Sequence, residues 1–191
     1  NTILGLFVYA DGLIVCSGTG IFFSQDGTSW LTINNASVAA GGDNYTAFTG
    51  RSAAARTSQG QCTFALFEGT TDYGEVLICD GANEPFFFKM TGTGILSSRT
   101  FFAGEITVSG TTAPKVGVIH ENHFVVGGAS TAKNTIYYSS SIDPDSFSGA
   151  GAGSIALTDA VVGLASFRSD LIIFCRNSIF KLSNISDSDN I

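Results

Sequence analysis

Short hydrophobic runs recur along the whole chain, and glycine or a polar turn sequence bounds each of them. No segment keeps the hydrophobic spacing of an amphipathic helix for several turns. Runs such as LIIFC (171–175) are apolar at every position, which is typical of inner strands covered on both faces. The pattern therefore predicts an all-β protein built from short strands, and it places both Ile173 and Phe174 in the core.

Four segments repeat one order of features: a hydrophobic strand, a tight polar connection and a second strand with Phe or Tyr. They span 5–24, 74–92, 117–140 and 163–183. Cys79, Gly127 and Cys175 occupy the same place in their repeats and are spaced by 48 residues. The first repeat has Cys16 there, 63 residues before Cys79, so one unit carries a longer insertion. Such a period is typical of β-propeller blades, because a small twisted sheet buries both faces only by stacking on copies of itself.

We therefore predict a β-propeller-like array of short antiparallel blades, with about four repeat units. The expected units cover residues 5–50, 51–110, 111–158 and 159–191, within a single domain over 1–191. The chain begins at Asn1, close to strand-like sequence, so we expect it to be a fragment of a longer chain. A six- to eight-bladed ring would then need further blades.

Composition and charge exclude several classes of protein. The chain has 16 Phe, 23 Gly and only 3 Pro, which suits many strands joined by glycine turns. Its net charge is −7 with nine Lys and Arg, and the sequence contains no basic cluster, which argues against a surface that grips phosphates. An acidic wall is still compatible with a passage for DNA. The apolar runs are too short to span a bilayer, so no membrane association is expected.

The repeat also predicts the state of the cysteines. Cys16, Cys79 and Cys175 fall in equivalent strands of different blades, so they are expected to be buried free thiols that do not meet. Cys62 lies in the strand QCTFALF and is expected to be buried as well. No CxxC spacing indicates a zinc site.

The stretch SQDGTSW (24–30) is close to the Asp-box of sialidase-type propellers, but Asp26 and Gly27 are adjacent, which makes it one residue short. Asp-Gly is by itself a hairpin-turn pair. We expect Ser24 and Asp26 to accept backbone N–H groups, and Trp30 to fold over the turn and bury its ring. A sialidase would also need an arginine triad. The arginines lie at no equivalent repeat positions: Arg51, Arg56, Arg99, Arg168 and Arg176.

Other polar groups give no catalytic, cofactor or metal site, and no enzyme is predicted. His120 and His123 are expected on opposite strand faces or at either end of a turn around 121–122. The acidic segments 143–145 and 187–190 are better explained as turns than as calcium loops. Nothing selects a pair among the glutamates: Glu68, Glu75, Glu84, Glu105 and Glu121. Three sequons, at Asn35, Asn44 and Asn184, leave a secreted glycoprotein as a further hypothesis.

Two segments carry a more specific likeness. VLICDGANEPFFFKMTG (76–92) resembles the blade motif of bacteriophage tail nozzle proteins, the tail tubular protein B-like family. TIYYSSSIDPDSF (135–147) and the segment 154–183 follow the pattern of the same family. The resemblance covers roughly residues 74–183, and it is a pattern of strands and turns rather than a catalytic signature.

The resemblance implies a virion structural protein. It would be a subunit of a ring in the tail, six copies in this family, through which DNA passes without specific binding. Its partners would be the portal, the adaptor and other tail proteins. The alternative hypothesis is a carbohydrate-binding or sialidase-like propeller, secreted or attached to a virion, which SQDGTSW and the many aromatic residues favour.

Overall fold

The structure is a computed structural model that describes residues 2–33, 44–45, 56–57, 59–69, 73–94 and 99–185. These residues form sixteen strands and no helix, so the prediction of an all-β fold is confirmed. None of the described segments is a helix with the length and hydropathy needed to cross a membrane.

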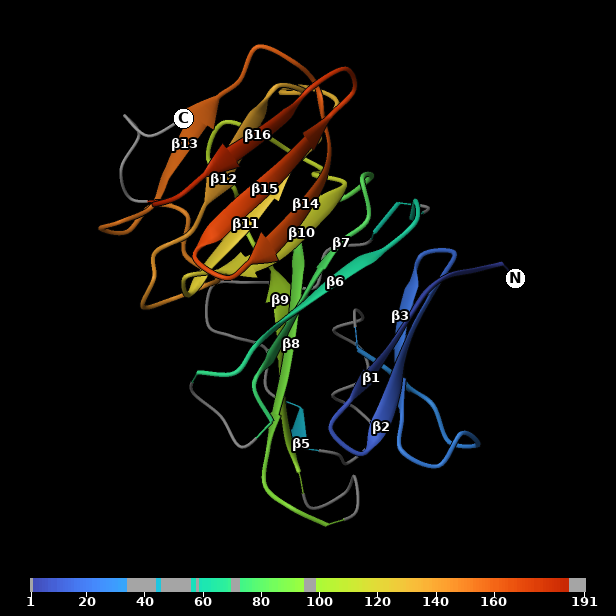
Figure 1. Ribbon diagram of the computed structural model, residues 1–191. Helices are drawn as coiled ribbons and strands as arrows, with labels where there is room; N and C mark the ends of the chain where they lie inside the picture. Colours follow the sequence, from blue (N-terminus) through green and yellow to red (C-terminus); the bar gives the residue numbers. More distant parts are fainter. Residues whose placement is uncertain are drawn as a thin grey trace.

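The strands form four sheets, which we call sheets A to D in chain order (Figure 1). Sheet A contains β1 (Ile3–Tyr9), β2 (Gly12–Ser17), β3 (Gly20–Ser24) and β4 (Leu31–Thr32). Sheet C contains β10 (Val116–His120), β11 (His123–Gly127), β12 (Thr135–Tyr138) and β13 (Gly153–Ala156). Sheet D contains β14 (Val161–Phe167), β15 (Asp170–Cys175) and β16 (Ile179–Leu182). In these three sheets every strand is antiparallel to the one before it.

Sheet B has five strands in the order β5-β9-β8-β7-β6. They are β5 (Asn44–Tyr45), β6 (Thr63–Phe67), β7 (Glu75–Cys79), β8 (Phe86–Thr91) and β9 (Thr100–Glu105). Four of them form an antiparallel meander, and β5 pairs with β9 in parallel. The short β5 falls within the first expected unit, 5–50, yet it joins the second sheet.

The sheets pack face to face in chain order, from sheet A at the N-terminal end to sheet D at the C-terminal end (Figure 1). One apolar cluster lies between sheets A and B, a second between B and C, and a third between C and D. We call β6, β10 and β14 the first strands of sheets B, C and D, because each begins an antiparallel meander; they lie side by side, since β10 contacts both β6 and β14. Because the described sheets form an open array rather than a closed ring, the β-propeller stays a prediction.

We call the side of a sheet that faces the next sheet in the chain its following face, and the other side its preceding face.

Aromatic rings fill the space between sheets A and B: the Phe88 ring lies 5.6 Å from the Phe23 ring and 5.7 Å from the Tyr9 ring. A Cβ atom at Gly5 would lie 2.7 Å from Cys62 Cβ, so this position needs glycine for the sheets to approach. Glycine and phenylalanine together therefore set the spacing of the stack.

The structure corrects the cysteine register in sheet D. Cys16 and Cys79 lie on the following faces of sheets A and B, whereas Cys175 lies on the preceding face of sheet D, against sheet C. Counted from the first residue of each second strand, Phe174 is the position equivalent to Cys16. Moving one residue along a strand exchanges its faces, so matching Cys175 to Cys16 by residue type was wrong.

All four cysteines are buried free thiols, as expected. The three that were compared across repeats do not pair with one another. Cys62, immediately before β6, does meet Cys16, and their thiols are hydrogen bonded. This hydrogen bond and burial raise the pKa of Cys16 far above its ordinary value, so the thiol stays protonated. The pair is part of the apolar contact between sheets A and B.

Candidate interaction surfaces

The preceding face of sheet A is apolar, and no described sheet covers it. Leu6 lies opposite Val15, which lies opposite Phe22, and Val8 lies opposite Leu13, so five apolar side chains form one continuous patch. Leu6 and Val8 are exposed, Val8 to 70%. The strand sequence ILGLFVY is apolar on both sides, which is typical of a strand with a sheet on each face. Among the described strands, only the following face of sheet A has such a neighbour.

The following face of sheet D has the same character. Phe174 lies opposite Ile179 on this face, and Ile172 and Phe167 extend the patch along β15 and β14. Ile179 is 68% exposed and Phe174 is 39% exposed. The expectation that Phe174 lies in the core is therefore wrong for this chain, because no sheet follows sheet D within the described residues.

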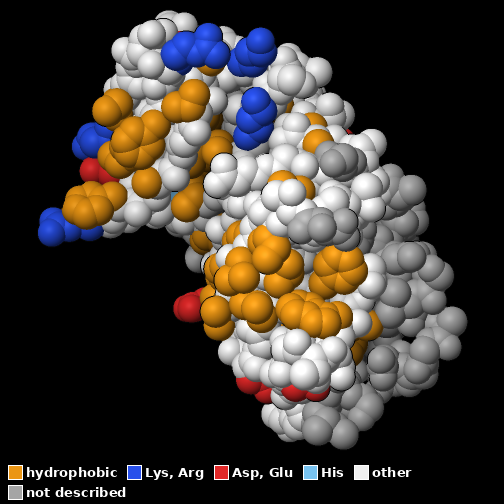
Figure 2. Space-filling view, turned by 90° about the vertical axis from the view of Figure 1, so that its right-hand side faces the viewer, with side chains coloured by type: hydrophobic (Ala, Val, Ile, Leu, Met, Phe, Trp, Pro, Cys, Tyr) orange, Lys and Arg blue, Asp and Glu red, His pale blue; other side chains and the backbone are white. Residues whose placement is uncertain are grey.

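Exposed large hydrophobic side chains are concentrated at the two ends of the stack. Nine are exposed in the described part of the chain. Four belong to sheet A and its turn, namely Ile3, Leu6, Val8 and Trp30, and four to sheet D, namely Val162, Phe167, Phe174 and Ile179. Ile142, in the loop after β12, is the ninth. Figure 2 shows two separate groups of hydrophobic side chains, one in the upper part of the view and one in the lower part.

Three cations meet at a cleft between sheets C and D. Lys115, Lys133 and Arg176 line a cleft of about 390 Å³, whose floor includes Val161 at the start of β14. None of the three has an ion-pair partner among the described residues. No basic cluster was predicted from the sequence, because these residues come from three separate segments of the chain. Figure 2 shows Lys and Arg side chains gathered at this end of the molecule.

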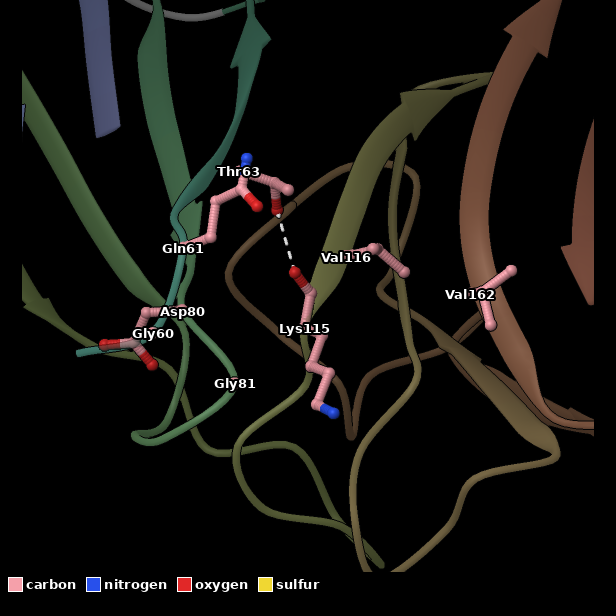
Figure 3. A pocket seen from close by; sticks show the side chains of 8 residues that line it. All are labelled: Gly60, Gln61, Thr63, Asp80, Gly81, Lys115, Val116 and Val162. Atoms are coloured by element: carbon pink, nitrogen blue, oxygen red, sulfur yellow. Dashed lines mark hydrogen bonds between the residues drawn. The ribbon is translucent and has the colours of Figure 1, made fainter. Parts of the chain in front are cut away.

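A second cleft of about 430 Å³ adjoins the first strands of sheets B, C and D (Figure 3). Thr63 Oγ1 donates a hydrogen bond to the Lys115 carbonyl oxygen, 3.3 Å away, and so joins β6 to the start of β10. Val162 of β14 lies across the opening (Figure 3). The side chains of Lys115 and Asp80 point apart, since Arg56 and nearby N–H groups hold the Asp80 carboxylate (Figure 3).

The segment 24–30 is the turn that the sequence predicted. Gly27 N donates to Ser24 Oγ at 2.9 Å, and Thr28 N and Ser29 N donate to Asp26 Oδ1 at 2.8 and 2.7 Å. These backbone donors lower the pKa of Asp26 well below its usual range. Trp30, however, is 44% exposed, so the expectation that its ring is buried over the turn is wrong.

The buried Ser24 gives a test of this turn. Replacing Ser24 by alanine should lower the free energy of unfolding by about 1 kcal/mol, because the Gly27 N–H loses its acceptor. Urea unfolding followed by circular dichroism measures the change. Ser169→Ala, at the exposed turn between β14 and β15, is the control. Equal stability of the Ser24 and Ser169 variants would contradict the role given to the Ser24 hydroxyl.

The described arginines in the core form ion pairs rather than a site for a substrate carboxylate. Arg99 makes two short hydrogen bonds to Asp11, of 2.6 and 2.7 Å, and thereby joins sheet B to the first turn of sheet A. Arg99 lowers the pKa of Asp11 to about 2. Arg56 pairs with Asp80 at 3.0 Å and with Glu105 at 3.4 Å. Neither guanidinium is available to a ligand.

The two histidines stand at either end of the turn around 121–122, directly opposite each other in β10 and β11. Both are buried, which the sequence did not indicate. His120 Nδ1 lies 2.9 Å from Ser166 Oγ of sheet D, and His123 Nδ1 is hydrogen bonded to the Ser139 carbonyl oxygen. Burial lowers the pKa of His120, so the ring is neutral at pH 7. The histidines therefore connect the β10–β11 hairpin to sheet D and to the loop after β12.

The described acidic residues of the predicted turn and of the glutamate set also have structural roles. Asp143 closes a turn through its carbonyl oxygen, which accepts from Ser146 N at 3.0 Å. Glu75 pairs with Lys89, yet burial still raises the pKa of Glu75. Among the described residues no three or more His, Cys, Asp or Glu side chains are grouped to hold a metal ion. The segment 187–190 lies outside the described residues, as does Arg51.

Comparison with known proteins does not assign the chain to a family. No protein-family model matches it, and no curated protein matches it. The resemblance to tail nozzle proteins therefore rests on the residue pattern of 76–92 and 135–183 alone.

Proposed function

We propose that this chain is a non-enzymatic structural subunit of a bacteriophage virion, a β-propeller part of the tail nozzle through which DNA leaves. One observation carries the structural role: the exposed apolar faces at both ends of the sheet stack. Exposed apolar patches of this kind mark contact surfaces, because burying them removes apolar area from water. The phage assignment draws in addition on the sequence pattern of the tail nozzle family.

The order of the sheets supports the propeller within this proposal. Successive antiparallel sheets pack face to face with neighbouring first strands, as blades do around a channel. Sheets of further copies at the two end faces would extend the array toward a ring. The family resemblance implies six copies around the tail axis, with portal, adaptor and other tail proteins as neighbours. A subunit repeated by rotation closes a ring through one kind of contact.

The charges suit DNA passage without tight binding. Four of the described cations are neutralised by carboxylates, and the chain carries a net charge of −7. Repulsion keeps DNA from adhering to such a wall. The unpaired cations at the cleft between sheets C and D are too few for a strong phosphate-binding surface.

Duplex DNA should accordingly bind weakly, with a dissociation constant of roughly 10⁻⁴ M or higher at physiological salt. With three contributing cations, log K should fall with log salt with a slope of about −2.7 or less steep. Fluorescence anisotropy with a labelled duplex measures both quantities. The variant with Lys115, Lys133 and Arg176 all changed to alanine should lose the residual binding. Tight binding with a much steeper slope would argue against a conduit.

The virion assignment is tested on particles. An antibody raised against this chain, used with gold labels in electron microscopy of purified virions, should mark the tail end. Mass spectrometry of the same particles should find peptides of the chain. An antibody against a scaffold protein that leaves before maturation is the negative control. Absence of the chain from purified particles would refute the virion role.

A carbohydrate-binding propeller is the second candidate, and the exposed ring of Trp30 favours it. An exposed indole offers a flat apolar surface that suits a sugar ring. A glycan array, followed by titration, should show saturable binding that is lost in Trp30→Ala and kept in Ile142→Ala. If the chain has only the structural role proposed above, the array should show no saturable binding, and neither variant should change that result.

A further inference from the structure

We propose that the following face of sheet D packs on the preceding face of sheet A of a second copy, so that copies associate head to tail. This inference rests on the ring assembly in the proposed function, and it names the two surfaces and the partner. The partner is a second copy of this chain, because only a sheet of the same kind extends the contact already used inside the molecule.

The internal contacts provide the geometry. Sheet A meets sheet B, B meets C and C meets D, each time with a following face against a preceding face. Two such faces remain without a sheet in the described structure, and they are one of each kind. A contact between sheet D and the next sheet A therefore repeats a contact that the fold makes three times. Two like faces would have to form a contact used nowhere in the stack.

The side chains of the two faces fit this arrangement. On sheet D, small residues along β14, Gly163 and Ala165, lie beside the larger Phe174 and Ile172 of β15. Inside the molecule the same order appears on the following face of sheet A, where Gly5 admits a Phe64 ring carbon to 2.8 Å from its Cβ position. On sheet D the Phe174 side chain lies 3.6 Å from the Cβ position of Gly163, so this face presents the Phe174 ring to the bulky groups of a preceding face.

Sheet A supplies such groups. Leu6, Val8 and Phe22 stand on its preceding face, and their neighbours Leu13 and Val15 are partly exposed. Burial of about ten apolar side chains, counted over both partners, would give the driving force. Without this contact the preceding face of sheet A would stay exposed to water.

Charge at the turns favours the same orientation. Arg168 lies in the turn between β14 and β15, and sheet A carries Asp26 in the turn between β3 and β4. Both turns are at the end of their sheet where the first strand finishes, since the strands alternate in direction. Head-to-tail stacking therefore brings Arg168 of one copy toward Asp26 of the next. An attractive pair of this kind favours one register over others.

The test uses two variants with one damaged face each. Val8→Glu places a charge on sheet A and Ile179→Glu places one on sheet D; both positions are exposed, so the variants should fold, which circular dichroism checks. Light scattering after gel filtration, over a range of protein concentrations, should give multimers for the unaltered chain and monomers for each variant alone. Ile142→Glu, on the exposed loop after β12, should behave as the unaltered chain.

Mixing the variants identifies the mode of contact. An equimolar mixture of Val8→Glu and Ile179→Glu has one intact sheet D face and one intact sheet A face, so it should form one-to-one dimers and nothing larger. The inference is overturned by a monomeric unaltered chain at all concentrations, or by loss of association in only one of the two variants. Head-to-tail multimers of a chain absent from virions would refute the phage role alone.

Discussion

Replacing Asp80 by alanine should destabilise the protein more than any other single change of a charged group that we describe. Both side chains of the Arg56–Asp80 pair are almost fully buried. Asp80 accepts hydrogen bonds from Arg56 at 3.0 Å, from Ala82 N at 2.9 Å and from Asn83 N at 2.8 Å. Without the carboxylate a buried guanidinium loses its main partner. We expect a loss of about 3 kcal/mol in the free energy of unfolding.

Two comparisons make this prediction specific. Glu105 remains 3.4 Å from Arg56 and offsets part of the loss, which is why we expect the lower end of the usual range. Asp80→Asn keeps the shape and one carbonyl acceptor, so it should cost less than alanine. Asp170→Ala removes the half-buried partner of the exposed Lys181 and should leave the urea midpoint almost unchanged. Similar losses for Asp80→Ala and Asp170→Ala would contradict the role of Asp80.

The repeat in the sequence was sufficient to predict strands and hairpins, because both depend on local patterns. Polar turns such as 24–30 were predictable in the same way, down to the Ser24 and Asp26 acceptors. The face of Cys175 was not, since the run LIIFC of β15 has one apolar residue more before its cysteine than the run LIVC of β2. That extra residue places Cys175 on the opposite face from Cys16.

Features that depend on distant segments lay beyond the sequence pattern. The cleft between sheets C and D joins Lys115, Lys133 and Arg176, whose spacing in the chain shows no cluster. The pairing of β5 with β9 likewise joins segments more than fifty residues apart. A hydrophobic strand also looks the same whether one or both of its faces are covered. The exposed faces of sheets A and D therefore became visible only in the packed molecule.

Changing Ile173 to alanine should lower the free energy of unfolding by about 2–5 kcal/mol, because the side chain is fully buried between sheets C and D and leaves a cavity. Its neighbour Phe174 provides the matched comparison. Phe174 is 39% exposed on the opposite face of β15, and its change to alanine should cost about 1 kcal/mol or less in the monomer.

The two variants also separate stability from assembly. In urea unfolding at low protein concentration, Ile173→Ala should have the lower midpoint. In light scattering at high concentration, Phe174→Ala should associate more weakly than the unaltered chain, since Phe174 belongs to the proposed contact with the next copy. If Phe174→Ala lowered the stability of the monomer more than Ile173→Ala, the exposed position of Phe174 in sheet D would be refuted. The uncovered following face, on which the head-to-tail contact depends, would be refuted with it.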